Sequence, residues 1–183
     1  MIEHRTGNLL KQNDLYAFLH SANCQCTMGS GIAKEIKITY PEIYEADLKT
    51  KKGDSSKLGT FSFAKTKDGK IGYNLYGQDK YGCDGKCYTN YDAVRMGLVG
   101  IKNHILKTIK CNVKIGLPCK MSSTRGGASW QEILKIIKNV FEDNKLITLV
   151  ICEFKEYSTK QDEFKDQLRK AYKKARLMGD DGI

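Results

Sequence analysis

The apolar positions of the 183-residue chain change repeatedly between the spacing of strands and the spacing of helices. Strand-like segments are expected around 17–20, 61–63, 71–75, 111–117 and 146–152. Helical spacing recurs between them, at 32–44, 90–107 and about 129–141. Because strands and helices take turns along the chain, we expect an α/β domain with a mostly parallel or mixed sheet sandwiched by helices.

Three local signals refine this picture. Asp68-Gly69 lies between two strand-like segments, and we expect a two-residue hairpin there because both residue types tolerate positive φ. The continuous apolar run from Leu146 to Cys152 is typical of a strand in the buried centre of a sheet. Ser129 is the expected N-cap of the helix that follows it.

The segment 1–154 is expected to form one domain, and 155–183 to add a charged amphipathic helix with a frayed tail. The apolar stripe of that helix consists of Phe164, Leu168, Ala171 and Ala175. We expect this stripe to pack back on the sheet, and an interface with a partner is the alternative.

Composition narrows the class of protein. The net charge is +10, from 31 Lys and Arg against 21 Asp and Glu, which favours polyanions or phosphorylated ligands. Five tyrosines between 73 and 91 offer an alternative as a stacking surface for single-stranded nucleic acid, which is not favoured because no recognised nucleic-acid-binding motif accompanies them. No signal peptide or membrane span is visible, so a soluble, cytoplasmic monomer is expected.

Seven cysteines are scattered along the chain. Reduced thiols are expected, because the number is odd and the chain is large enough to fold without disulfides. The alternative is one zinc site formed by Cys24, Cys26, Cys83 and Cys87, although only the second pair has the spacing that structural zinc prefers. Nothing in the sequence requires a metal or a cofactor.

Two loops share one design, in which small residues follow a strand and open a helix. The first spans Met28–Ala33, and the second spans Ser122–Gly127. Glycine lets the backbone approach a ligand, and the free amides of a helix N-terminus attract anions, so each loop is a candidate phosphate cradle. Two cradles indicate a diphosphate or dinucleotide-like ligand. The alternative is that both are ordinary strand-to-helix turns.

The stretch Leu19–Ala33 resembles the ADP-ribose-binding loop of macrodomains, and is most similar to the branch of ADP-ribose 1''-phosphate phosphatases, including viral members. Gly7–Leu10, Tyr73–Gln78 and Pro118–Gly127 resemble further elements of that branch, and the resemblance covers about 5–154. It implies a three-layer α/β/α fold with a central mixed sheet.

The resemblance also implies a set of ligand-binding residues. Asn8 would contact adenine, Leu9 would also belong to the ligand site, Asn23 would bind the distal ribose, and Phe154 would stack on the base. The two phosphates would lie on Gly29, Ser30, Gly31 and Ile32 and on Ser122, Ser123, Thr124, Arg125, Gly126 and Gly127. Gln78 stands in the region where a related glycohydrolase carries a catalytic lysine.

His20 and Asn23 are the catalytic residues that the resemblance implies, with neutral His20 orienting water or protonating a leaving oxygen. The second loop lacks the acidic residue that phosphatase-like relatives often carry, since Ala128 and Ser129 precede Trp130. The expected function is hydrolysis of the phosphate of ADP-ribose 1''-phosphate, in the host cytoplasm if the protein is viral. The alternatives are a non-catalytic reader of ADP-ribose-type nucleotides and an ADP-ribosyl hydrolase acting on protein or nucleic acid.

Overall fold

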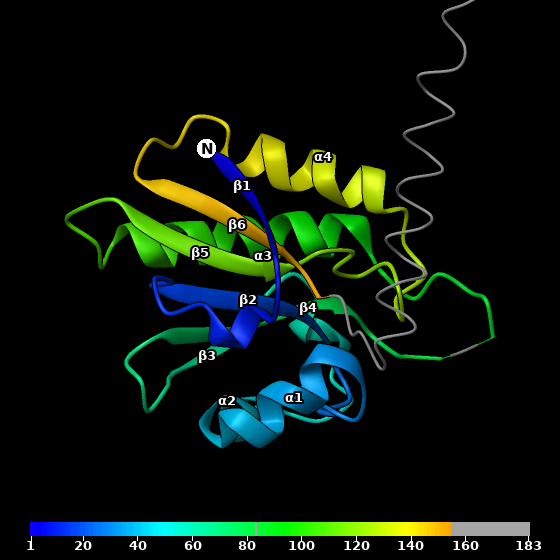
Figure 1. Ribbon diagram of the computed structural model, residues 1–183. Helices are drawn as coiled ribbons and strands as arrows, with labels where there is room; N and C mark the ends of the chain where they lie inside the picture. Colours follow the sequence, from blue (N-terminus) through cyan, green and yellow to red (C-terminus); the bar gives the residue numbers. More distant parts are fainter. Residues whose placement is uncertain (83, 155–183) are drawn as a thin grey trace, which may run out of the picture.

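The computed structural model describes residues 1–82 and 84–154 (Figure 1). The helix expected within 155–183 and the thiol of Cys83 lie outside the described residues. None of the described helices is both long enough and apolar enough to cross a membrane.

A six-stranded mixed sheet forms the middle layer, as the sequence predicts (Figure 1). Its strands, in spatial order, are β1 (Ile2–Thr6), β6 (Ile147–Glu153), β5 (Val113–Pro118), β2 (Ala17–Asn23), β4 (Ile71–Gln78) and β3 (Phe61–Lys65). Every neighbouring pair is parallel except β3 and β4. The carboxyl ends of the neighbouring strands β2 and β5 therefore lie side by side at the same end of the sheet, where the two small-residue loops begin.

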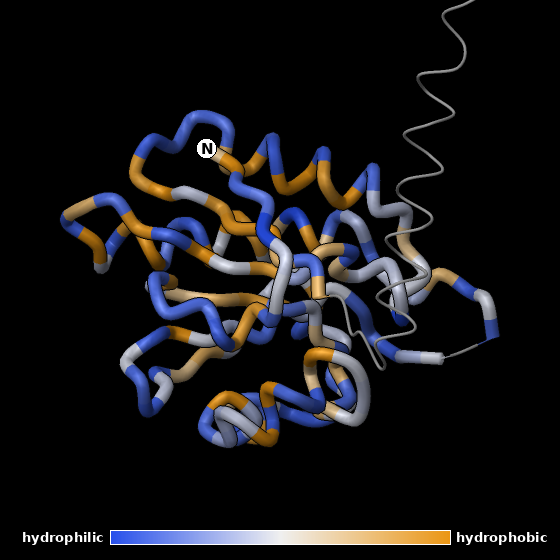
Figure 2. Tube along the Cα trace, in the orientation of Figure 1, coloured by the Kyte–Doolittle hydropathy of each residue, from blue (hydrophilic) through white to orange (hydrophobic). Residues whose placement is uncertain are grey.

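Helices cover both faces of the sheet (Figure 1). The element bounds are α1 (Gly31–Thr39), α2 (Pro41–Leu48), α3 (Tyr91–Leu106) and α4 (Trp130–Phe141), with short 3-10 turns η1 (Leu9–Lys11) and η2 (Ser55–Lys57). Figure 2 shows the hydrophobic residues of α4 along the side that faces the sheet. As expected, Ser129 is its N-cap, and the hydroxyl accepts from the amide of Glu132.

The two larger of the three buried clusters among the described residues hold the layers together. Leu19 of β2 belongs to the cluster on the α3 and α4 side. Its neighbour Phe18 points the other way and packs with Ile36 of α1 and Ile43 of α2. Because side chains alternate across a strand, His20 follows Phe18 onto the α1 and α2 side.

The structure corrects two expectations and adds a strand. The β3–β4 hairpin is present, but its connection runs over five residues, and of Asp68 and Gly69 only Gly69 has positive φ. β4 is buried along nearly its whole length instead of alternating, because α3 packs against one of its faces and α2 against the other. β1 was not predicted, since its sequence of Ile, Glu, His, Arg and Thr carries little apolar periodicity.

Candidate functional site

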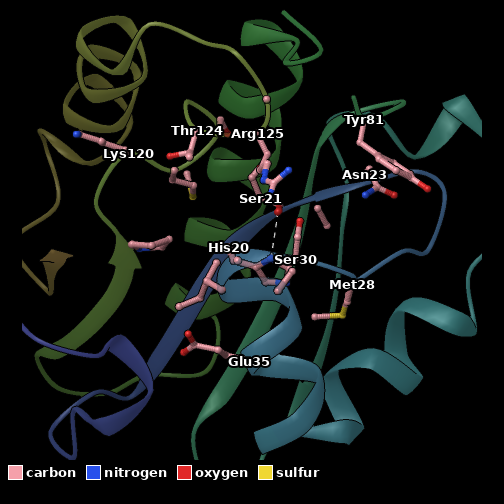
Figure 3. Close-up of a pocket in the computed structure, with 18 of the residues that line it drawn as sticks. His20, Ser21, Asn23, Met28, Ser30, Glu35, Tyr81, Lys120, Thr124 and Arg125 are labelled. Atoms are coloured by element: carbon pink, nitrogen blue, oxygen red, sulfur yellow. Dashed lines mark hydrogen bonds between the residues drawn. The ribbon is translucent and has the colours of Figure 1, made fainter. Parts of the chain in front are cut away.

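A cavity of about 820 Å³ opens beyond the carboxyl ends of the parallel strands. Its walls come from the N-terminal turn, the β2–α1 loop, the end of β4, the loop after β5 and the end of β6. In open α/β sheets ligands bind at this edge, between loops that leave neighbouring strands. Figure 3 shows side chains from both small-residue loops around this space.

The β2–α1 loop is held in shape by Asn23. Its Oδ1 accepts hydrogen bonds from the Gln25 amide (2.9 Å) and the Thr27 hydroxyl (3.1 Å), and its Nδ2 donates to the Thr27 carbonyl (3.2 Å). Asn23 also lines the cavity (Figure 3). One amide thus organises the loop that leads to the helix.

The start of α1 has the features of an anion cradle. Ser30 is the N-cap residue but makes no side-chain capping hydrogen bond, so the first-turn amides remain available to a ligand or to water. Gly31 has a φ of +54°, which a side chain rarely adopts. Gly29, Ser30, Gly31 and Ile32 all line the cavity. The positive end of the helix dipole adds to the attraction for phosphate.

The loop after β5 is compact and packs against 86–89. The Thr89 hydroxyl donates to the Ser122 carbonyl (2.9 Å), and the amides of Tyr88 and Thr89 donate to the Gly126 carbonyl (2.8 and 3.1 Å). Ser122 has a φ of +64°, and its buried Oγ makes no hydrogen bond in the described structure. Contacts between the two segments therefore fix the second cradle.

The charges of the lining are divided between its parts. Lys120 and Arg125 come from the loop after β5, whereas the carboxylates of the described lining, Glu35 and Glu153, come from α1 and the end of β6. Positive side chains beside a phosphate cradle neutralise its ligand. The loop after β5 is accordingly the better site for a phosphate.

His20 lies at the floor of the cavity with no exposed surface. The Nδ2 of Asn74 donates to the Ile43 carbonyl (2.9 Å) and to Ser62 Oγ (3.0 Å), so Asn74 Oδ1 faces His20. His20 Nε2 lies 2.7 Å from that oxygen and donates to it, while Nδ1 lies 3.1 Å from the Ser21 carbonyl (Figure 3). Burial lowers the pKa of His20, although both contacts favour its charged form, so the ring is neutral at pH 7.

Stability is expected to depend on this histidine. The unfolded chain takes up a proton below about pH 6.5 that native His20 does not, so the free energy of unfolding falls as the pH drops below that value, by at most about 1.4 kcal/mol per pH unit. Above it, His20 contributes no slope. Thermal melts at pH 7.5 and 5.5 should show a smaller pH effect in His20→Gln than in the wild type. Equal pH effects in the two proteins would contradict the buried neutral state.

Asn8 and Glu35 meet at the other side of the lining. Asn8 Oδ1 accepts from the Leu10 amide (2.8 Å) as the cap of η1, and its Nδ2 donates to Glu35 Oε2 (3.3 Å). Both polar atoms of Asn8, the residue expected to contact adenine, thus already have a partner within the protein.

Most of the residues singled out from the sequence line the one cavity. Those that do are Asn8, Leu9, His20, Asn23, Gly29, Ser30, Gly31, Ile32, Gln78, Ser122, Thr124, Arg125, Gly126 and Phe154. Ser123 and Gly127 belong to the same loop but are not part of the lining. The structure does not test the roles assigned to any of these residues, which stay predictions.

The sequence analysis missed Glu35 and Lys120. The signal for Glu35 was present, since it lies four residues after Gly31 and therefore on the same side of the helix. Lys120 carried no such signal, because its position depends on a turn with a φ of +58°.

The acidic residues that follow β4 in the chain, Asp79, Asp84 and Asp92, do not line the cavity. Asp84 pairs with Lys86 (3.0 Å), and Asp92 with Arg95 (3.2 Å). Asp79 is half-buried beside the β2–α1 loop, where the Cys24 amide donates to its carbonyl (3.1 Å). The carboxylate of the described lining that lies near the loop after β5 is therefore Glu153, at the end of β6, next to the point where the Cys119 amide donates to the Cys152 carbonyl (2.8 Å).

The cysteines of the described chain are free thiols. Cys24 and Cys26 are buried, whereas Cys87 is exposed. No three His, Cys, Asp or Glu side chains converge as a metal site requires among residues 1–82 and 84–154. Burial raises the pKa of Cys24 to about 11, so its thiol is protonated at neutral pH.

Comparison with known proteins gives little at the level of sequence. No protein-family model matches the chain. A stretch of 44 residues is 50% identical to an uncharacterized 17.5 kDa protein of Enterobacteria phage T4, from its tk-vs intergenic region. That match covers 24% of this chain and only 28% of the phage protein.

Solved structures are similar over most of the chain. The macrodomain of Mycobacterium tuberculosis DarG is 23% identical with a TM-score of 0.68, over 83% of this chain and 97% of that one. DarTG of Thermosipho africanus, in complex with ADP-ribose, is 15% identical with a TM-score of 0.61, over 86% of this chain and 43% of that one. The chain therefore has the macrodomain fold, an α/β/α sandwich around a mixed six-stranded sheet.

Proposed function

We propose that this protein binds ADP-ribose or a close derivative in the cavity beyond β2 and β5. The observation that carries the proposal is the convergence of two small-residue loops on one cavity, one at a helix N-terminus and one with Lys120 and Arg125. Two anion cradles side by side suit a diphosphate. The structure of Thermosipho africanus DarTG, which has a similar fold, is a complex with ADP-ribose, and this supports the choice of ligand.

Thermal unfolding with added ligand tests the proposal. Saturating ADP-ribose at about 100 times its dissociation constant should add about 2.7 kcal/mol of stability, since only the native state binds it. For a chain of this size we expect the melting temperature to rise by roughly 5–10 °C. ADP, ribose 5-phosphate and a single-stranded oligonucleotide serve as comparisons. A shift with the oligonucleotide and none with ADP-ribose would support the nucleic-acid alternative and overturn the proposal.

The site favours a protein that binds ADP-ribose without hydrolysing it. His20 is neutral, donates a hydrogen bond from Nε2 to Asn74 Oδ1 and has no exposed surface, so it is poorly placed to activate water. The carboxylates of the described lining, Glu35 and Glu153, come from α1 and the end of β6, and neither belongs to the loop after β5. The loop that would carry the general base in a phosphatase of this type thus supplies no carboxylate of its own.

Hydrolysis of ADP-ribose 1''-phosphate remains the second candidate, favoured by the place of His20 at the cavity floor beside Asn23. Phosphate release distinguishes the two. A reader should release phosphate no faster than His20→Ala while both proteins bind ADP-ribose. Release by the wild type that is lost in both His20→Ala and Asn23→Ala, with binding retained, would establish the phosphatase instead.

An ADP-ribosyl hydrolase would act without the lysine that Gln78 replaces, and would instead release ADP-ribose from a modified protein or nucleic acid.

A further inference from the structure

The outer edge of β3 is an open side of the sheet. β3 is the last strand in the spatial order and, among the described residues, pairs with β4 alone (Figure 1). The Thr60 carbonyl accepts from an amide of β4 (3.1 Å), and the Thr66 amide donates to the residue just before β4 (2.8 Å). Because backbone groups alternate in direction along a strand, Ser62 and Ala64 also bond toward β4. The residues between them therefore direct their amides and carbonyls outward.

These outward residues are Phe61, Phe63 and Lys65. Within residues 1–82 and 84–154, no hydrogen bond reaches their backbone amides and carbonyls. An edge of this kind is a template for pairing with another strand.

A fixed aromatic side chain lies at the centre of this edge. Phe63 is 45% exposed, although its ring centroid lies 4.3 Å from that of His104 and 5.8 Å from that of Tyr73. His104 is itself held, since its Nδ1 lies 2.8 Å from the Tyr73 hydroxyl. Because these contacts orient the Phe63 ring in advance, little side-chain freedom would be lost when a partner buries it. Exposed aromatic residues of this kind are enriched in protein interfaces.

The edge is complementary to itself. When two copies of β3 lie antiparallel with their Phe63 residues opposite each other, Phe61 of each copy lies opposite Lys65 of the other. Every outward amide then faces an outward carbonyl of the second copy, and a shift in either direction leaves some of these groups unpaired. The two lysines lie at opposite ends of the pair, so like charges do not oppose each other, and each can contact an aromatic face.

We propose that β3 is a dimerisation edge, through which two copies of this chain pair antiparallel about a two-fold axis at Phe63. The two sheets then join into one continuous sheet. Because the β4 strands of the two copies run in opposite directions, the two cavities open at opposite ends of the joined sheet and stay accessible. A pair of five-residue strands is a small interface, so we expect a dissociation constant of roughly 10–100 µM. The monomer expected from the sequence is then the state at low concentration.

Sedimentation velocity of the full chain from about 5 to about 500 µM tests the proposal, and the mass should rise from one chain toward two. Phe63→Lys places two like charges opposite each other at the axis and should weaken the dimer at least about tenfold. Phe63→Tyr keeps the aromatic ring and should dimerise like the wild type. Leu146→Lys is the matched control, since it adds the same charge at an apolar residue of similar exposure, 42%, before the distant strand β6.

Amide exchange measured by NMR at low and high protein concentration separates strand pairing from unspecific association. The amides of Phe61, Phe63 and Lys65 should exchange more slowly at high concentration, whereas those of Ser62 and Ala64, already bonded to β4, should not change. Thermal melts establish that each variant is folded.

Three results would overturn this inference. They are a wild type that stays monomeric up to about 500 µM, a folded Phe63→Lys that dimerises like the wild type, and outward amides that are already protected in the dilute monomer because another segment of the chain covers the edge. The inference does not depend on the proposed function. ADP-ribose titrated into the same samples decides that function separately, because no residue of β3 lines the cavity.

Discussion

Replacing Gly126 by alanine should weaken ADP-ribose binding at least tenfold and lower the melting temperature. A Cβ at this position would lie 2.1 Å from Thr89 Oγ1 and 2.3 Å from the Ser122 carbonyl oxygen. The loop after β5 would have to move away from 86–89, with the loss of the hydrogen bond between Thr89 and Ser122. Overpacking of this kind costs about 1–3 kcal/mol, or roughly 2–12 °C for a chain of this length. Calorimetric titration and thermal melts measure the two effects.

Two variants serve as controls for Gly126→Ala. Gly29→Ala adds the same methyl group where nothing lies within 4 Å, so its stability in the absence of ligand should change by less than about 0.5 kcal/mol. Thr89→Val removes only the hydroxyl that donates to the Ser122 carbonyl and should have a smaller effect on affinity than Gly126→Ala. Wild-type affinity in Gly126→Ala would show that the second loop does not contribute to binding.

Asn23→Ala is the second substitution with a large expected effect. It removes three hydrogen bonds within the β2–α1 loop, each contributing about 0.5–1.5 kcal/mol. Without them the loop loses the shape that leads into the first cradle, and we expect the dissociation constant for ADP-ribose to rise roughly thirtyfold or more. The measurement is a calorimetric titration at low and high protein concentration.

Asn23→Asp separates the effect of Asn23 on the shape of the loop from its direct effect on ligand binding. Its carboxylate keeps both acceptor bonds, from the Gln25 amide and the Thr27 hydroxyl, but loses the donor to the Thr27 carbonyl and adds a negative charge. The melting temperature should recover most of the loss seen in Asn23→Ala, whereas affinity for the anionic ligand should stay low. Full recovery of affinity in Asn23→Asp would contradict a role for the Asn23 donor or for local charge.

Much of the fold could be predicted because the relevant signals are local. Val113, Ile115 and Leu117 alternate as a strand and are buried on one side of β5, and Ser129 caps α4 as its sequence context predicts. β1 could not be predicted in this way. Its pairing with β6 is a long-range contact, and the edge strand carries too few apolar residues for a periodic signal.

The candidate site, like the fold, could be predicted from the sequence only where the signals are local. The two small-residue loops could be located from the sequence because glycine and serine before a helix have a local physical meaning. The partners of individual side chains could not, because they come from distant segments. Asn74 lies 54 residues from His20, and Glu35 lies 27 residues from Asn8, yet these contacts decide which ring nitrogen of the histidine carries the proton and how the amide is oriented.

A calorimetric titration of ADP-ribose into the wild-type protein tests the central claim most directly, with Gly126→Ala titrated under the same conditions. The wild type should bind one ADP-ribose per chain with a dissociation constant below about 100 µM, and the variant at least tenfold more weakly. Absence of saturable heat from the wild type at millimolar ligand, or equal binding by the two proteins, would contradict an ADP-ribose site between the two loops.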